Sequence, residues 1–519
     1  MIASFTRLLR GAAVLLALSV APVVVSAGPR PAALSSGLDA TASAQCYAFV
    51  QPDLDELRAS RKKVFAWYFP PYPLSISNES DSQNWYERWL SPDGGGGEYR
   101  STGGFLRDRP LPMPQRADSN WRQLNFEVEI RQAIAMGLDG FILEMSYLQK
   151  HPDDRWNRVL AMLDAAKAVD PGFKIMLAPG FPKAADAMPD ELAATILSVA
   201  NHPSVFHLPD GRLPMATFYP ERPAKDGGKP IQWWQLLFEQ LHTQGVDVAW
   251  YPVFLSPGTM NALPDLDEWY RTSAGYSRWD GRWASQASSN LTEAANARSR
   301  GLQWIARASF QDTRVRKPAY LELRHWESSN SATLRAFFEQ AIASDTDWLN
   351  VLTWNDYSET QTAPSRDRGY AVADLIAYYT TWFKTGAPPP IYRDALYYFH
   401  RKQRSDAPYD TTKQTAGEMK TPVGTPAAEN NVELLAFLAE PGELTIRQGS
   451  DIKVQAANAG VTSFKVPLVP GTTPQFELRR QGLLVESLVS RTPVAAAVDY
   501  QDMTYYAGGS IECARPLQP

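Results

Sequence analysis

From residue 63 to residue 386, short apolar runs alternate with amphipathic segments. The apolar runs are rich in β-branched and aromatic residues, which favours buried strands. The segments between them repeat apolar residues at helical spacing. In the first long one, Phe126, Ile130 and Ile134 recur every four residues and Gly137 follows the last turn. The predicted strands cover residues 63–69, 139–145, 174–181, 213–219, 246–255, 276–281, 304–310 and 348–354.

Eight strands, each followed by a helix, predict an α/β fold of the (β/α)8 type, a TIM barrel, over residues 61–386. The alternative is an open doubly wound sheet. The count of eight argues against it, as does the absence of a Gly-x-Gly-x-x-Gly turn after any strand. Beyond the three prolines at 388–390 the pattern changes to short strand-like runs separated by Gly and Pro. They predict a C-terminal β-sandwich over residues 387–519, an accessory module packed on the barrel.

The first residues have the pattern of a secretory signal peptide. Arg7 and Arg10 precede an apolar run, and a small-x-small triplet ends at Ala27, which predicts cleavage there. The run is too short, and too interrupted by Pro22, for a membrane span. We therefore expect a secreted protein, extracellular or periplasmic, with a leader and linker over residues 28–60.

The net charge, the histidines and the cysteines bear on the protein's possible partners, cofactors and disulfide bonds. A net charge of -5 without a basic block argues against nucleic acid or a membrane surface as a partner. The histidines show no zinc-binding spacing, so we expect neither a metal nor another cofactor. Cys46 and Cys513 can form one disulfide in an oxidising compartment, with two free thiols as the alternative. We expect a monomer.

In a barrel of this type the reacting groups come from the carboxyl ends of the strands. The predicted strand ends are rich in aromatic residues, with carboxylates and amides between them. Flat rings stack on sugars and polar groups fix hydroxyls, so this composition favours a polysaccharide site. Each aromatic ring could instead pack in the core. Asp139 could instead form an ion pair or a cap at the bottom of the barrel. The expected substrate-binding residues are Trp67, Tyr68, Asp139, Glu144, Trp250, Tyr251, Trp279, Asp280, Trp354, Asn355 and Tyr357.

One acidic pair is best placed for chemistry. Asp356 directly follows the eighth predicted strand, and Glu359 comes three residues later in the stretch TWNDYSET. Three residues of chain span at most about 10–11 Å between Cα atoms. A turn can therefore bring both carboxyls to the mouth, as glycoside hydrolysis requires. The alternative is two solvated loop charges.

This stretch, with KVFAWYF at 63–69 and AIAMGLDGFILE at 133–144, resembles glycoside hydrolase family 71, the endo-1,3-α-glucanases or mutanases. The resemblance implies a (β/α)8 barrel with a β-sandwich and cleavage of α-1,3-glucosidic bonds with inversion. It also implies that Asp356 and Glu359 are the catalytic pair. Two positions depart from the family. Ser358 replaces a Gly of the motif, and Glu144 stands where fungal members usually have Asn.

We expect crowding and the charge of Asp356 to favour the protonated form of Glu359. Glu359 then donates a proton to the leaving oxygen, while Asp356 activates water. Two alternatives remain open. The first is hydrolysis of another α-linked glycan, such as a mannan or a mixed α-glucan. The second is a carbohydrate-binding barrel without catalysis.

Overall fold

The structure is a computed structural model that describes residues 46–70, 72, 78–80, 83–145, 154–180, 188–315 and 323–511. All of them belong to one compact unit. The predicted signal peptide and the leader up to residue 45 lie outside the described residues, as does Cys513. Within the described ranges, no helix has the length and apolar character needed to cross a membrane.

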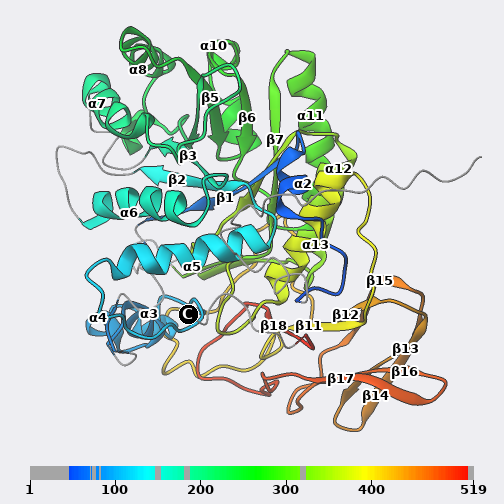
Figure 1. Cartoon of the computed structure of the whole chain (residues 1–519). Coiled ribbons are helices and arrows are strands. Elements are labelled where there is room, and N and C mark those ends of the chain that lie inside the picture. The colour runs from blue at the N-terminus through cyan, green and yellow to red at the C-terminus, as the bar shows by residue number, and fades with distance from the viewer. Residues whose placement is uncertain are drawn as a thin grey trace, which may run out of the picture. The chain divides into compact units, whose positions relative to one another are not determined.

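Eight parallel strands close into a barrel in the order β1-β10-β7-β6-β5-β4-β3-β2 (Figure 1). Each corresponds to one predicted strand, so the (β/α)8 prediction is confirmed. The strands are β1 (Lys63–Tyr68), β2 (Gly140–Met145), β3 (Lys174–Pro179), β4 (Leu213–Phe218), β5 (Val248–Phe254), β6 (Gly275–Arg278), β7 (Gln303–Ser309) and β10 (Trp348–Leu352).

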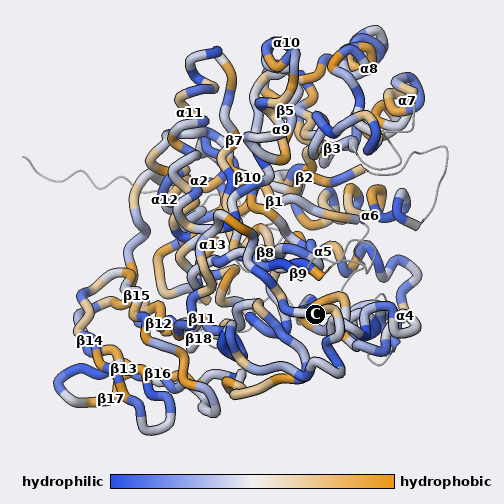
Figure 2. The backbone as a smooth tube through the Cα atoms, turned by 180° about the vertical axis from the view of Figure 1, so that it is seen from behind, coloured by the Kyte–Doolittle hydropathy of each residue, from blue (hydrophilic) through white to orange (hydrophobic). Residues whose placement is uncertain are grey.

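Helices surround the barrel, and their ends follow local sequence. The turn after α5 passes through Gly137 at φ +77°, and α13 ends at Gly386 at φ +81°, a backbone region that favours glycine. Both hydrophobic and hydrophilic residues occur along α6, α7 and α8, as amphipathic helices require (Figure 2). The long helices are α5 (Trp121–Ala135), α6 (Asp154–Val169), α7 (Pro189–Ala200), α8 (Ile231–Thr243), α11 (Ser289–Ser299), α12 (Ala332–Ala343) and α13 (Ala371–Thr385). The short ones are α2 (Leu54–Ala59), α3 (Trp85–Leu90), α4 (Gly94–Gly97), α9 (Pro257–Asn261) and α10 (Leu266–Thr272).

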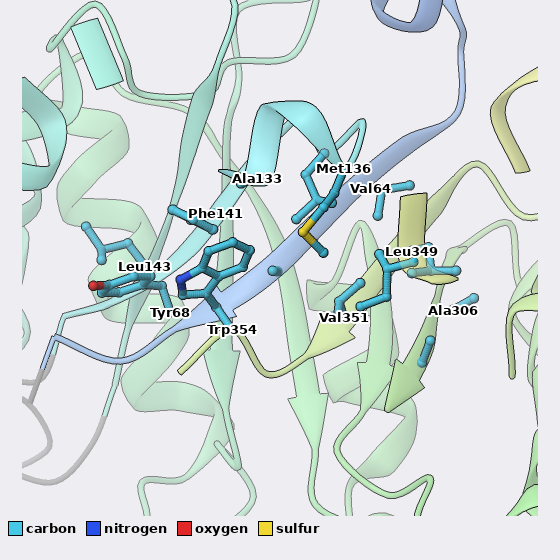
Figure 3. Close-up of a cluster of buried hydrophobic side chains, with 14 of the residues drawn as sticks. Val64, Tyr68, Ala133, Met136, Phe141, Leu143, Ala306, Leu349, Val351 and Trp354 are labelled. Carbon is cyan, nitrogen blue, oxygen red and sulfur yellow. The ribbon is translucent and has the colours of Figure 1, made fainter. Parts of the chain in front are cut away.

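Side chains of the barrel strands alternate between two buried layers. In β1, Val64 and Tyr68 join the layer between strands and helices, while Phe65 and Trp67 fill the barrel interior. Figure 3 shows part of the outer layer, where Tyr68 lies beside Trp354. Only residues of the inner set can reach the barrel mouth, so the layer decides which aromatic residues can contact a substrate.

The C-terminal part is a β-sandwich, as predicted. Its two antiparallel sheets have the strand orders β15-β12-β11-β18 and β14-β13-β16-β17. Leu434, Leu444 and Phe476 belong to the core that the two sheets share. The first sheet also packs on the barrel, because Phe437 lies 5.0 Å from the ring of Tyr378 in α13. The strands are β11 (Ala395–His400), β12 (Asn431–Leu438), β13 (Gly442–Gln448), β14 (Asp451–Ala457), β15 (Gly460–Pro467), β16 (Gln475–Arg480), β17 (Leu483–Val489) and β18 (Tyr506–Gly509).

Two further connections hold these parts together. A hairpin of β8 (Asp312–Val315) and β9 (Leu323–Trp326) lies between β7 and α12, in a stretch where the sequence showed only an insertion. Near the start of the described chain, the amide of Val50 donates to the carbonyl of Pro390 at 2.8 Å. Cys46 is buried and disulfide-bonded. The residues just after position 45 are therefore tied to the segment that links the barrel to the sandwich.

Candidate active site

The loop after β10 brings both predicted catalytic carboxyls to the mouth end of the barrel. Asn355 fixes this loop, since its amide oxygen accepts from the amide of Phe69 at 2.8 Å and its amide nitrogen donates to the Phe69 carbonyl at 3.1 Å. The amide of Asp356 donates to the hydroxyl of Thr353 at 2.9 Å. Asn355 thus has a structural partner on the β1 side, and its role as a substrate contact stays a prediction.

Asp356 is buried, with 7% of its surface exposed. Its Oδ1 accepts hydrogen bonds from the hydroxyl of Tyr72 at 2.6 Å and from the hydroxyl and amide of Ser358 at 2.8 and 3.1 Å. Burial, and then the charge of Glu359, raise the pKa of Asp356 to about 7, although the Tyr72 and Ser358 donors lower it. Asp356 can therefore hold a proton near neutral pH.

Glu359 is paired with a cation. Its Oε2 lies 2.8 Å from Nη2 of Arg314, and 19% of its side chain is exposed. The sequence led us to expect the favoured proton on Glu359, but the carboxyl whose pKa is raised is Asp356. The arginine comes from the β8–β9 hairpin, which no motif in the sequence connects to the acidic pair. The raised pKa therefore belongs to the member of the pair that the sequence did not favour as the acid, and the division of roles stays a prediction.

Three other predicted site residues meet near the mouth. Trp67 and Glu144 lie on the inner face of β1 and β2, and the indole nitrogen of Trp67 is 3.4 Å from Oε2 of Glu144. The ring of Trp67 lies 5.3 Å from that of Trp279, which in turn lies 4.3 Å from Phe218. A carboxylate within an aromatic cluster fits a sugar-binding wall.

Several predicted aromatic contacts are corrected because their rings face the outer layer. Tyr68 donates to Oε2 of Glu129 in α5 at 2.6 Å. Trp250 stacks on Trp234 of α8 at 5.5 Å, and Trp354 lies 5.0 Å from Phe141. These three rings lie behind the strands, where no substrate in the barrel mouth can reach them.

Two further predicted aromatic residues, Tyr251 and Tyr357, lie in different places. Tyr251 does face the interior, but its hydroxyl donates to Gln303 at 3.0 Å, at the amino end of β7. It therefore lies at the bottom of the barrel. Tyr357 turns toward α3, where its ring lies 5.3 Å from that of Tyr86. Tyr251 therefore does not line the mouth, whereas Tyr357 also lines a small cavity together with Ser358 and Glu359.

Two predicted acidic contacts are structural. Asp139 precedes β2 at the amino end of the barrel, where it accepts from the amide of Val64 at 2.7 Å and pairs with Lys384 at 2.7 Å. This is the alternative expected for it. Asp280 is buried between Arg307 at 2.9 Å and Arg278 at 3.2 Å. Both carboxylates are buried and paired with the protein's own cations.

Sequence reasoning missed Tyr72, Ser358 and Arg314 as partners of the acidic pair. Of these three residues, only Ser358 stood out in the sequence, because it replaces the Gly of the family motif. Here that departure adds the Ser358 hydroxyl as a donor to Asp356, beside the backbone amide that a glycine would also supply. In the part of the chain that the structure describes, no group of three or more His, Cys, Asp or Glu residues could hold a metal ion.

Comparison with known proteins identifies the family of this chain. The family model of glycosyl hydrolase family 71 matches residues 115–512. The chain is 25% identical over 383 residues to a glucan endo-1,3-alpha-glucosidase of Schizosaccharomyces pombe, covering 69% of this chain and 84% of that protein. It is 23% identical to an ascus wall endo-1,3-alpha-glucanase of the same yeast, over 46% of this chain and 54% of that one.

Further similarities are more distant. A mutanase of Penicillium rubens is 23% identical over 35% of this chain and 43% of its own length. A solved GH99 endo-alpha-mannosidase from Bacteroides thetaiotaomicron superposes with a TM-score of 0.46 at 15% identity, over 62% of this chain and 97% of that chain. The family match spans most of the sandwich and of the barrel, including the loop with the acidic pair. The chain is a glycoside hydrolase and belongs to glycosyl hydrolase family 71.

Proposed function

We propose that this enzyme hydrolyses the α-1,3-glucosidic bonds of α-1,3-glucan. The observation that supports this most directly is the acidic pair after β10, with Asp356 poised near neutral pH and Glu359 held as an ion pair. Most glycosidases use two carboxyl groups whose different environments give them different roles. The choice of substrate rests on the relatives, whose names describe enzymes that act on 1,3-linked α-glucan or mutan.

We infer a single displacement. One carboxyl transfers its proton to the glycosidic oxygen as the bond from that oxygen to the anomeric carbon breaks. The other removes a proton from a water whose oxygen forms the new bond to the anomeric carbon on the opposite face. The leaving sugar gains a hydroxyl, and the new hemiacetal has inverted configuration. Neither metal nor organic cofactor takes part.

Trp67, Trp279 and Glu144 are proposed to line the sugar site. We further infer an exported, monomeric enzyme whose signal peptide ends at Ala27, with the catalytic domain at 61–386 and the accessory domain at 387–519. Export agrees with the substrate, because an insoluble polymer meets the enzyme only outside the cytoplasm.

The test is incubation with insoluble α-1,3-glucan, followed by proton NMR of the first anomer released. The expected product is the β-anomer. Asp356→Asn and Glu359→Gln are each expected to reduce turnover by about 100-fold or more. First release of the α-anomer would contradict inversion. Activity on α-mannan or a mixed α-glucan alone would replace the substrate. Turnover at background level that both variants leave unchanged, with binding retained, would indicate a carbohydrate-binding protein.

A further inference from the structure

The β8–β9 hairpin holds the catalytic Glu359 at two points. The amide of Thr313 in β8 donates to the backbone carbonyl of Glu359 at 3.0 Å. The next residue, Arg314, places Nη2 2.8 Å from Oε2 of the Glu359 side chain. One short strand thus fixes both the main chain and the carboxylate of a residue that is distant in sequence. The hairpin is therefore part of the site's architecture.

Arg314 is itself fixed in place. Its Nε and Nη2 donate to the two carboxylate oxygens of Asp312, each at 2.8 Å, and Asp312 also accepts from Nε of Arg282 at 2.6 Å. The guanidinium groups of Arg314 and Arg282 each lie 4.9 Å from the ring centre of Trp326. A paired and stacked guanidinium loses little further freedom when it binds another carboxylate. Arg314 is pre-organised to hold Glu359.

Asp312 and Arg314 stay charged over the working pH range. Burial raises the pKa of the Asp312 carboxyl, but the charges of Arg314 and then Arg282 lower it to about 2. Burial lowers the pKa of Arg314, but the charges of Asp312 and Glu359 hold it above its ordinary value. The cluster therefore presents a permanent cation to the acidic pair.

The C-terminal region supports the hairpin from the other side. The amide of His325 in β9 donates to the carbonyl of Lys420 at 3.1 Å, and the amide of Lys420 donates to Leu323 at 2.9 Å. Val315 and Leu323 pack in one apolar cluster with Met419 and Met503. The hairpin is thus held between the barrel and the chain beyond residue 387.

We propose that Arg314 is a positioning residue that orients the Glu359 carboxylate and offsets its charge, so that Glu359 is the base and Asp356 the acid. This inference rests on the proposed function and reverses the roles expected from the sequence. In each turnover the proton of Asp356 goes to the leaving oxygen. Glu359 takes the proton of the attacking water, and exchange with solvent restores both groups.

The experiment compares Arg314→Met, Arg314→Lys and Arg282→Met by the pH dependence of kcat/KM on whichever α-glucan the wild type hydrolyses. Arg282→Met is the matched control, because it removes the other arginine from Asp312 and Trp326. Among the described residues, the charged groups facing Glu359 include Arg314 and Asp356, and Arg107 and Asp108 line a small cavity beside it. All but Arg314 stay unchanged in the Arg314 variants.

Arg314→Met is expected to move the acidic limb of the profile, which the proposed base sets, upward, because the Glu359 carboxylate then loses its paired cation. The alkaline limb should also rise, since Arg314 lowers the pKa of Asp356. We expect kcat to fall by about tenfold or more. Arg314→Lys should restore most of the acidic limb, and Arg282→Met should leave that limb in place.

Thermal unfolding identifies variants that fail to fold. A folded Arg314→Met enzyme with an unshifted acidic limb overturns the inference and leaves the proposed function intact. An equal shift in Arg282→Met also overturns it, because the effect then belongs to the cluster as a whole. A wild-type protein without activity on any α-glucan overturns the proposed function, and the inference with it.

Discussion

The hydroxyl of Tyr72 lies 2.6 Å from Oδ1 of Asp356 and also 2.6 Å from the hydroxyl of Ser358. A residue from the loop after the first strand thus sets the hydrogen bonding of a carboxyl after the last barrel strand. These donors favour the charged form of Asp356, against burial and the charge of Glu359. The balance between them keeps the pKa of this carboxyl near neutral instead of far above it.

Removing the Tyr72 hydroxyl tests this balance. Tyr72→Phe should raise the pKa of Asp356, because the charged form loses a donor. If Asp356 is the acid, the alkaline limb of the pH profile of kcat/KM moves upward by up to about one unit. Ser358→Gly, which keeps the amide donor and restores the family's glycine, should move it in the same direction by less. A downward shift in either variant would contradict the assigned balance.

The division of labour between the two carboxyls predicts a leaving-group effect. A substrate with fluoride as the leaving group needs no proton from the enzyme. On a 1,3-linked α-oligoglucosyl fluoride, Asp356→Asn should keep activity within about tenfold of wild type, whereas Glu359→Gln should lose about 100-fold or more. Fluoride release measures both. The opposite ranking would assign Glu359 as the acid.

Glu129 predicts a pH dependence of stability. Burial raises its pKa from 4.5 to about 7 in the folded protein, although the hydrogen bond from Tyr68 lowers it. The unfolded chain releases this proton near pH 4.5, so the stabilisation present below that pH is lost as the pH rises to about 7.

Glu129→Gln removes this linkage, since an amide stays neutral and can still accept from Tyr68. At pH 8 the variant should be more stable than wild type by up to about 3 kcal/mol. At pH 4 the difference should be small. Urea unfolding at both pH values measures it, with Glu127→Gln on the same helix as the control. Equal effects of the two variants at pH 8 would refute the assignment.

Asp280 distinguishes a structural carboxylate from a substrate contact. Asp280→Asn leaves Arg307, which is fully buried, and Arg278 with one less counter-charge. The expected cost is about 3 kcal/mol or more of unfolding free energy. The KM of the protein that remains folded should not change. A raised KM with unchanged thermal stability would restore Asp280 to the sugar site.

Strand positions were predictable because each barrel strand is a short apolar run bounded by turn residues and a helix. The acidic pair was predictable because both members lie within one continuous motif. The face of each strand residue was not. Trp67 and Tyr68 are adjacent and equally aromatic, yet one fills the interior and the other packs on α5. In a parallel barrel both faces are buried, so no polar and apolar alternation marks the inner one.

Two of the sandwich strands escaped prediction for a related reason. In β11 every residue is buried, so the run from Ala395 to His400 lacks the alternation of a half-exposed strand. β18 has only four residues, two of them glycine. Their place in the sheet depends on pairing with β12 and with each other across a long stretch of chain.

The amino-acid sequence by itself determined the barrel, the sandwich and the acidic pair, because local hydrophobic patterning and one contiguous motif are enough to specify them. Only the tertiary structure decided which carboxyl has the raised pKa and which aromatic residues face the barrel interior. Those outcomes depend on burial and on charges such as Arg314, which a separate hairpin brings next to Glu359. The electrostatic energy of two charges depends on their distance in space, which cannot be read from their separation along the chain.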